Sequence, residues 1–226
     1  MSNVNKGRLI SFEGLDGAGK TTQIKLLEGW LDSHGISYIP TREPGGTPLG
    51  KEIRQLLLER PELAITPLTE ALLFQADRAQ HFEKIILPAL EAGKLVITDR
   101  YIDASMAYQG YGRGVDKNFI KSLSAHATQG REPDLTILLD LNPRQVPARI
   151  GMQLSLPGVS DAAQNDVRVE QNRLDTEDRA FHRRVQEGFR RLAERYPERI
   201  KVVDASMSIE KIHQEIVTLV QTLLAF

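Results

Sequence analysis

The chain has 226 residues, and its 29 Lys and Arg nearly balance its 30 Asp and Glu, which leaves a formal net charge of −1. A protein that binds long stretches of nucleic acid usually carries a basic surplus, because each phosphate contact needs a cation, so the balance argues against that class and favours a small anionic ligand. The absence of cysteine excludes disulfides and thiolate chemistry.

Short apolar runs alternate along the chain with segments of helical period. The runs predict strands, buried on both faces, at 9–12, 36–39, 95–98, 135–141 and 200–203. Between them, capping residues and apolar spacing predict helices at 19–34, 48–59, 67–81, 116–129, 169–195 and 208–226. Strands separated by helices indicate an α/β fold, a five-stranded parallel sheet flanked by helices, in one domain over residues 1–226.

The first predicted strand leads directly into a glycine-rich loop that matches the P-loop pattern G-x-x-x-x-G-K-[ST]. Its glycines allow backbone N–H groups to converge on a triphosphate. Lys20 is expected to reach the β- and γ-phosphates, and Thr21 to lie near a phosphate oxygen or Mg²⁺. The predicted nucleotide-binding residues are Gly14, Leu15, Asp16, Gly17, Ala18, Gly19, Lys20, Thr21 and Thr22.

Three further clusters hold candidate binding residues. Arg42 follows the second strand, at the sheet edge where open α/β folds bind ligands, and its guanidinium suits a phosphate. Phe74 and Arg78 share one helix face, which fits base recognition but equally a core ring and a solvated charge. Asp99 ends the third strand like the acid that holds Mg²⁺ in many P-loop enzymes, and Arg100 follows it.

Five motifs occur in the order and spacing of bacterial thymidylate kinases, and the chain resembles that family over about residues 8–204. They are FEGLDGAGKTT, TREPGGTPLG, ALLFQADRAQH, DRYIDASMAYQGYGRG and NRLDTEDRAFHRRV. The resemblance implies a P-loop nucleoside monophosphate kinase fold with a lid. It also implies an enzyme that transfers the γ-phosphoryl group of ATP, with Mg²⁺, to dTMP, giving dTDP for the dTTP supply, and that works as a homodimer.

The resemblance also implies roles for individual residues. Lys20, Asp16 and Arg100 are the implied catalytic residues outside the lid, and Thr21 and Asp99 the implied metal site. The implied dTMP-binding set comprises Asp16 near the sugar 3′-hydroxyl, Arg42 and Arg100 at the phosphate, Pro44 at the methyl pocket, Arg54 flanking the base, Phe74 stacked on thymine, Arg78 on a thymine carbonyl, Ser105 and Gln109 at the base edge, and Tyr108 against the 2′ carbon.

A lid is expected over residues 144–173. The variable P-loop positions 15–18 contain no Arg or Lys, so the resemblance implies that the lid supplies the catalytic arginine, as in the bacterial type. Arg149 and Arg173 are the predicted catalytic candidates, and Arg149 and Arg168 the predicted ATP contacts. The run 151–166 has no clear period and reads as a flexible excursion, so motif matching does not decide which arginine reaches the transferred group.

Two other functions fit part of this pattern. Another deoxynucleotide or deoxynucleoside kinase would share the P-loop, although Arg42 and Arg100 favour an acceptor that already carries a phosphate. A non-catalytic nucleotide-binding regulatory protein would not need Lys20, Asp99 and Arg100 intact. No apolar run approaches the roughly 18–20 residues that span a bilayer, and the polar start lacks a signal-peptide core, so we expect a cytoplasmic protein without membrane or nucleic-acid partners.

Overall fold

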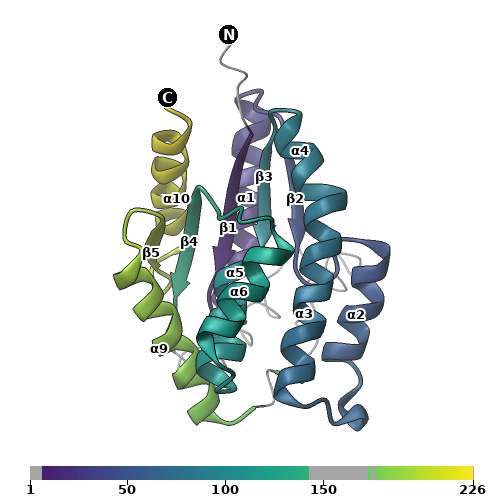
Figure 1. Cartoon of the computed structure of the whole chain (residues 1–226). Helices are drawn as coiled ribbons and strands as arrows, with labels where there is room; N and C mark the ends of the chain where they lie inside the picture. The colour runs from purple at the N-terminus through teal and green to yellow at the C-terminus, as the bar shows by residue number, and fades with distance from the viewer. Residues whose placement is uncertain (1–6, 143–172, 175–176, 226) are drawn as a thin grey trace, which may run out of the picture.

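The computed structural model describes residues 7–142, 173–174 and 177–225. These residues form a parallel sheet with helices on both faces (Figure 1). The strand order is β2-β3-β1-β4-β5, and every neighbouring pair is parallel. This arrangement confirms the predicted α/β fold. The strands are β1 (Arg8–Glu13), β2 (Tyr38–Arg42), β3 (Leu95–Asp99), β4 (Leu135–Asp140) and β5 (Ile200–Asp204).

The helices agree with most of the predicted ones. Threonine caps and the prolines after them start α2 and α3, as the sequence indicates. The α-helices are α1 (Lys20–Ser33), α2 (Pro48–Leu58), α3 (Pro67–His81), α4 (Leu87–Glu91), α5 (Ile102–Ser105), α6 (Lys117–Ala127), α9 (Arg179–Arg195) and α10 (Ile209–Leu224). Shorter turns are the 3₁₀-helix η1 (Pro61–Leu63) and the π-helical segments η2 (Phe82–Ile86) and η3 (Met106–Gly112).

Helices cover both faces of the central strands. Since successive residues of a strand point to opposite sides, neighbouring residues pack into different clusters. On one side, Ile137 belongs to an apolar cluster with residues of α1 and α10. On the other side, the adjacent Leu138 packs in a cluster with residues of α9 and η3. The two-sided burial explains why the central strands read as nearly continuous apolar runs.

The register of the sheet brings the ends of three strands to one edge. Arg42 at the end of β2 pairs with Asp99 at the end of β3. Asp99 in turn pairs with Phe12, one residue before the end of β1. Since the P-loop follows β1 directly, the predicted phosphate-binding and metal-binding residues meet at this carboxyl edge.

The start of the predicted helix over 169–195 is wrong. The helix α9 begins at Arg179, and residues 169–172 lie outside the described part of the chain. Asp178 has extended backbone, and its carboxylate accepts the N–H of Phe181 at 2.6 Å, which makes Asp178 the N-cap. Upstream, the N–H of Arg173 donates to the carbonyl oxygen of Leu58 at 3.1 Å, so the chain there is held against α2.

Proline and glycine account for the other differences. The second strand covers Tyr38–Arg42 rather than 36–39, because Pro40 is tolerated in β2, an edge strand. Helical structure also extends over 82–91, beyond the predicted elements, and over 102–112, where the run DASMAYQG indicates a helical turn. Pro88, Gly110 and Gly112 disfavour a regular α-helix, so the sequence does not predict long helices there. Each of them lies in or next to a π-helical turn.

Candidate active site

The loop between β1 and α1 has the backbone geometry of a phosphate cradle. Gly14, Gly17 and Gly19 have φ values of 133°, 78° and 99°, which L side chains rarely adopt. A Cβ atom at Gly14 would lie 2.5 Å from the carbonyl oxygen of Leu139, so this residue must be glycine. Because Gly19 has no side chain, α1 begins without a side-chain cap, and its positive end faces the loop. All predicted nucleotide-binding residues from Gly14 to Thr22 lie in this loop or in the first turn of α1.

Lys20 and Arg100 meet at the carboxylate of Asp16. The buried ammonium group of Lys20 donates to the carbonyl oxygens of Gly14 at 3.3 Å and Leu15 at 3.2 Å, and it lies 3.4 Å from Asp16 Oδ1. A guanidinium nitrogen of Arg100 lies 2.7 Å from the same carboxylate oxygen. Asp16 therefore stands between the cation that is expected to bind the donor and the cation that is expected to bind the acceptor.

The backbone of the β3–α5 turn holds Arg100 in an uncommon conformation. Its φ is 70°, a left-handed value that is costly for a non-glycine residue. The turn is fixed to β1: the N–H of Arg100 donates to Phe12 O at 2.9 Å, and that of Tyr101 to the Glu13 carboxyl group at 2.8 Å. The guanidinium carbon lies 4.8 Å from the centre of the Tyr108 ring. Burial alone would lower the pKa of Arg100, but nearby acidic groups raise it well above its usual value.

A half-open cavity lies beside Arg100. It combines apolar walls with a few polar groups, as small-molecule sites do. Every residue of the predicted dTMP-binding set except Arg42 lines it. The lining residues are Asp16, Glu43, Pro44, Arg54, Leu58, Phe74, Arg78, Arg100, Ala104, Ser105, Tyr108, Gln109 and Leu174.

One end of the cavity concentrates positive charge. The pKa of Arg54 is lowered by burial and then by repulsion from Arg42, while the carboxylate of Asp16 partly offsets both effects. Arg100 also contributes repulsion, so three guanidinium groups influence one another here. Arg42 itself is exposed at the end of β2 and lies outside the cavity lining. Convergent cations that partly repel one another suit a doubly charged phosphate group.

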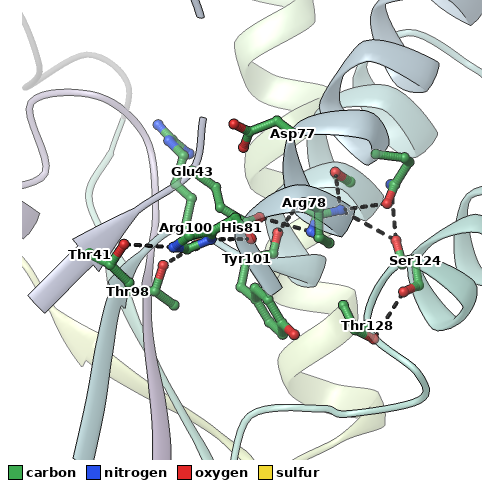
Figure 2. Close-up of polar contacts among 12 residues, drawn as sticks. Thr41, Glu43, Asp77, Arg78, His81, Thr98, Arg100, Tyr101, Ser124 and Thr128 are labelled. Atoms are coloured by element: carbon green, nitrogen blue, oxygen red, sulfur yellow. Dashed lines mark hydrogen bonds and ion pairs between the residues drawn. The ribbon is translucent and has the colours of Figure 1, made fainter. Parts of the chain in front are cut away.

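The other end of the cavity is built around Arg78. Its side chain is buried, so it is not a solvated surface charge, one of the two interpretations that the sequence allows. Figure 2 shows its guanidinium at the centre of a polar network. Its Nε donates to Glu43 at 2.8 Å, and its Nη2 donates to Tyr101 O at 2.8 Å. Its Nη1 donates to the hydroxyl of Ser105 at 2.9 Å. These contacts fix a planar donor group at the cavity wall, beside the half-buried ring of Phe74.

Gln109 and Tyr108 complete this wall from η3. The side-chain amide of Gln109 donates to the buried carboxylate of Glu70 at 3.0 Å, which leaves its orientation defined. The Tyr108 ring makes edge contacts with Phe181 and Phe189 of α9, with centroids 6.2 Å apart in each pair. The packing of α9 on η3 therefore sets the shape of the cavity next to Arg100.

Oxygen donors at the predicted metal site fit Mg²⁺. Asp99 Oδ1 is buried and has no hydrogen-bond partner, and Thr21, in the first turn of α1, is exposed. A hydroxyl and a carboxylate are the hard ligands that Mg²⁺ prefers when phosphate and water supply the rest. Among the described residues, no group of three or more His, Asp or Glu side chains could hold a metal by itself.

Of the three predicted lid arginines, the structure places only Arg173. Its Nε donates to the carbonyl oxygen of Leu57 at 3.0 Å, and its Nη2 is bonded to the carboxylate of Glu70. Since Glu70 also binds Gln109, these contacts place Arg173 close to the wall of the cavity that Gln109 lines. Arg149 and Arg168 lie outside the described residues.

Several acidic residues at the site are absent from the predicted set. Glu43 lines the cavity, and Glu13 and Glu70 are fully buried. Burial raises the pKa of Glu13 to about 8, with a smaller contribution from Asp103. The motif strings contain Glu13 and Glu43, and Glu70 directly precedes one of them, but a sequence pattern alone does not separate a buried carboxyl group from an exposed one. No helix among the described residues is long and apolar enough to cross a membrane.

The chain is similar to known proteins over almost its whole length. Residues 12–216 match the family model described as thymidylate kinase. A thymidylate kinase of Exiguobacterium sp. is 46% identical over 210 residues, covering 93% of this chain and 92% of that protein. One from Clostridium novyi is 41% identical over 213 residues, covering 94% and 98%. The crystal structure of thymidylate kinase from Ehrlichia chaffeensis has a TM-score of 0.72 at 34% identity, covering 96% of this chain and 99% of that one.

Proposed function

The chain belongs to the thymidylate kinase family, and we infer that it is a phosphotransferase that converts dTMP into dTDP in the supply of dTTP for DNA synthesis. The observation that carries this function is the position of Asp16. It lies 3.4 Å from the P-loop lysine and 2.7 Å from Arg100 at the acceptor cavity. A phosphate cradle and an anion-binding cavity that share one carboxylate are suited to transfer between two bound phosphates.

ATP is the proposed phosphoryl donor, and the P-loop is its proposed site. The converging backbone N–H groups and Lys20 bind the β- and γ-phosphates, and Thr21 and Asp99 would hold Mg²⁺. When bound, Mg²⁺ neutralises charge on the phosphate oxygens. Lys20 and Arg100 already pair with Asp16 and with carbonyl oxygens, so they are oriented toward the space where phosphates would compete for them.

The acceptor phosphate is proposed to bind at Arg42 and Arg100. Arg54, which the resemblance assigns beside the base, is proposed to contribute here as well, because repulsion from Arg42 and Arg100 helps to lower its pKa. Because that phosphate is already an anion, the reaction needs no strong general base. Catalysis depends on holding the two phosphates in line and on stabilising the charge that develops between them. Arg100 performs both tasks in this proposal, since its guanidinium is fixed by Asp16, Gly14 O and the ring of Tyr108.

Selection of thymine is proposed for the opposite end of the cavity. Phe74 offers a face on which a base can stack, and the ordered donors of Arg78 and Gln109 can bond its edge. Between the two ends, Tyr108 is proposed to stand where a ribose 2′-hydroxyl would clash, and Pro44 lines the wall beside Arg54. The comparisons do not favour the two alternatives, another kinase of the same scaffold or a non-catalytic nucleotide-binding protein.

Three features remain proposals from the sequence. The first is a lid over 144–173 in which Arg149 or Arg173 reaches the transferred group and Arg149 or Arg168 binds ATP. The second is a homodimer, which the exposed Leu68 and Leu72 on α3 support. The third is a cytoplasmic location without nucleic-acid partners.

The direct test of the donor is formation of dTDP from dTMP. With ATP and Mg²⁺, chromatography should show dTDP and ADP in equal amounts, and removal of Mg²⁺ by a chelator should abolish both. Restoring excess Mg²⁺ should recover the rate. Turnover that persists in the chelator, or ADP without dTDP, would contradict the proposed reaction.

A further inference from the structure

His81, the last residue of α3, bridges the two residues that flank Arg42. Its ring is fully buried. Nδ1 lies 2.9 Å from Glu43 Oε1, and Nε2 lies 2.6 Å from the hydroxyl of Thr41 (Figure 2). An ionised carboxylate only accepts hydrogen bonds, so Nδ1 carries the proton that is donated to Glu43. In the neutral ring, Nε2 then accepts from the hydroxyl of Thr41.

This bridge fixes the backbone on which Arg42 stands. Thr41 and Glu43 face the buried ring, while Arg42 between them is exposed, as expected when successive side chains alternate in direction. The turn packs closely on the ring as well, since a Cβ atom at Gly46 would lie 2.6 Å from His81 Cδ2. The two hydrogen bonds to His81 therefore hold the side chains on either side of Arg42, in addition to the β2–β3 pairing and the bond from the Glu43 N–H to Asp99 O at 2.9 Å that hold its backbone.

The same histidine reaches the base end of the cavity through Glu43. The second carboxylate oxygen of Glu43 lies 2.8 Å from Arg78 Nε, and both side chains are almost fully buried. A buried ion pair of this kind is sensitive to any loss of its supporting hydrogen bonds. Arg78 has further partners, but Glu43 is the acidic residue that fixes its Nε edge.

We propose that His81 is a positioning residue that couples the two ends of the acceptor cavity. Through Thr41 and Glu43 it orients Arg42 at the phosphate end, and through Glu43 it orients Arg78 at the base end. The proposal rests on the proposed function, because it assigns these ends to the phosphate and the base of dTMP. The ring itself touches neither substrate in this account.

Two variants separate the two arms of the bridge. Thr41→Val removes only the hydroxyl, and Thr41→Ser is its matched control because it keeps that hydroxyl. His81→Gln keeps an amide that can reach Thr41 but withdraws the donor from Glu43. Thermal unfolding of each variant first establishes that it is folded, and Thr41→Val keeps the test available if His81→Gln does not fold.

The measurements are steady-state kinetics with dTMP and calorimetric binding of thymidine, which lacks the phosphate. Thr41→Val should raise KM for dTMP about five- to tenfold, leave KM for ATP unchanged and leave thymidine affinity within about twofold. His81→Gln should raise KM for dTMP by at least as much and also weaken thymidine binding about five- to tenfold. Thr41→Ser should stay close to the wild type in both measurements.

The outcomes distinguish this proposal from the function itself. If the wild type does not phosphorylate dTMP, the proposed function fails. If the wild type is active and a folded Thr41→Val variant has an unchanged KM for dTMP, the positioning of Arg42 by His81 is wrong. If a folded His81→Gln variant binds thymidine as tightly as the wild type, the coupling to Arg78 is wrong.

Discussion

At the scale of single residues, the site depends on charges that are held in place before any substrate binds. Asp16 and Glu43 each pair with an arginine at the wall of the acceptor cavity, and Glu70 accepts a hydrogen bond from Gln109 of the same wall. The motifs predicted the cations, because arginine and lysine next to a P-loop suggest phosphate binding. They predicted Asp16 as a site residue but not its pairing with Arg100, and they did not predict Glu43 or Glu70, because these contacts join residues from separate elements.

Replacement of Arg100 by lysine tests this view of the acceptor site. Lysine keeps the charge, but it lacks the planar, forked guanidinium with which Arg100 bonds both Asp16 and the carbonyl oxygen of Gly14. We expect Arg100→Lys to lower kcat/KM for dTMP about a hundredfold or more, with little change in ATP affinity. The matched control is Arg191→Lys, at an exposed i,i+4 pair with Glu187. Equal activity of the two variants would contradict the role of Arg100.

Replacement of Glu13 by glutamine tests the buried carboxyl group beside the turn of Arg100. Its pKa is raised from 4.5 to about 8, so the folded state holds the proton more tightly than the unfolded state. Stability from this group is therefore greatest at low pH and is lost as the pH rises from about 4.5 to about 8. Glu13→Gln keeps an oxygen for the N–H of Tyr101 but does not titrate.

The measurement for Glu13 is the thermal unfolding midpoint between pH 5 and pH 8.5. The wild type should lose stability across this range more steeply than Glu13→Gln, with the largest difference at the alkaline end. Glu187→Gln, on an exposed face of α9, provides the comparison. Parallel profiles for wild type and Glu13→Gln would show that Glu13 does not titrate in this way.

At the scale of elements, the predictable parts are those with local signals. The five strands, the P-loop and the capped helices α2 and α3 follow from apolar runs, glycine spacing and threonine–proline pairs. The start of α9 and the π-helical turns do not, because they result from contacts between elements. The burial of Arg78 could not be predicted from local signals either, because its guanidinium is enclosed only where α3, α5 and α6 meet.

The contact of η3 with α9 shapes the cavity, and a glycine makes it possible. A Cβ atom at Gly112 would lie 2.7 Å from the Phe181 ring and 2.9 Å from Val185. We expect Gly112→Ala to lower the free energy of unfolding by about 1–3 kcal/mol through overpacking. Gly29→Ala, in the middle of α1 with nothing near the new methyl group, should instead be neutral or stabilise by up to about 1 kcal/mol.

Urea unfolding followed by circular dichroism measures both glycine variants. Because Phe181 also contacts the Tyr108 ring, Gly112→Ala should raise KM for dTMP while Gly29→Ala leaves it unchanged. If the two alanine variants unfold at the same urea concentration, the packing of η3 on α9 is looser than the structure indicates.

At the scale of the whole molecule, a net charge of −1 conceals a strongly uneven distribution. Arg42, Arg54 and Arg100 are close enough to shift the pKa of Arg54 downward together with its burial. They gather at the carboxyl edge of the sheet, where β1, β2 and β3 end in register. The sequence gives the order of the motifs, and the parallel sheet brings them to one place.

The choice of acceptor tests the central claim most directly. Initial rates of ADP release with ATP and Mg²⁺ should be compared for dTMP, thymidine, dCMP and UMP under identical conditions. We expect kcat/KM for dTMP to exceed every other value by about a hundredfold or more, because the site binds both a phosphate and the polar edge of thymine. Equal efficiency with thymidine, or no ADP release that depends on dTMP, would contradict the account.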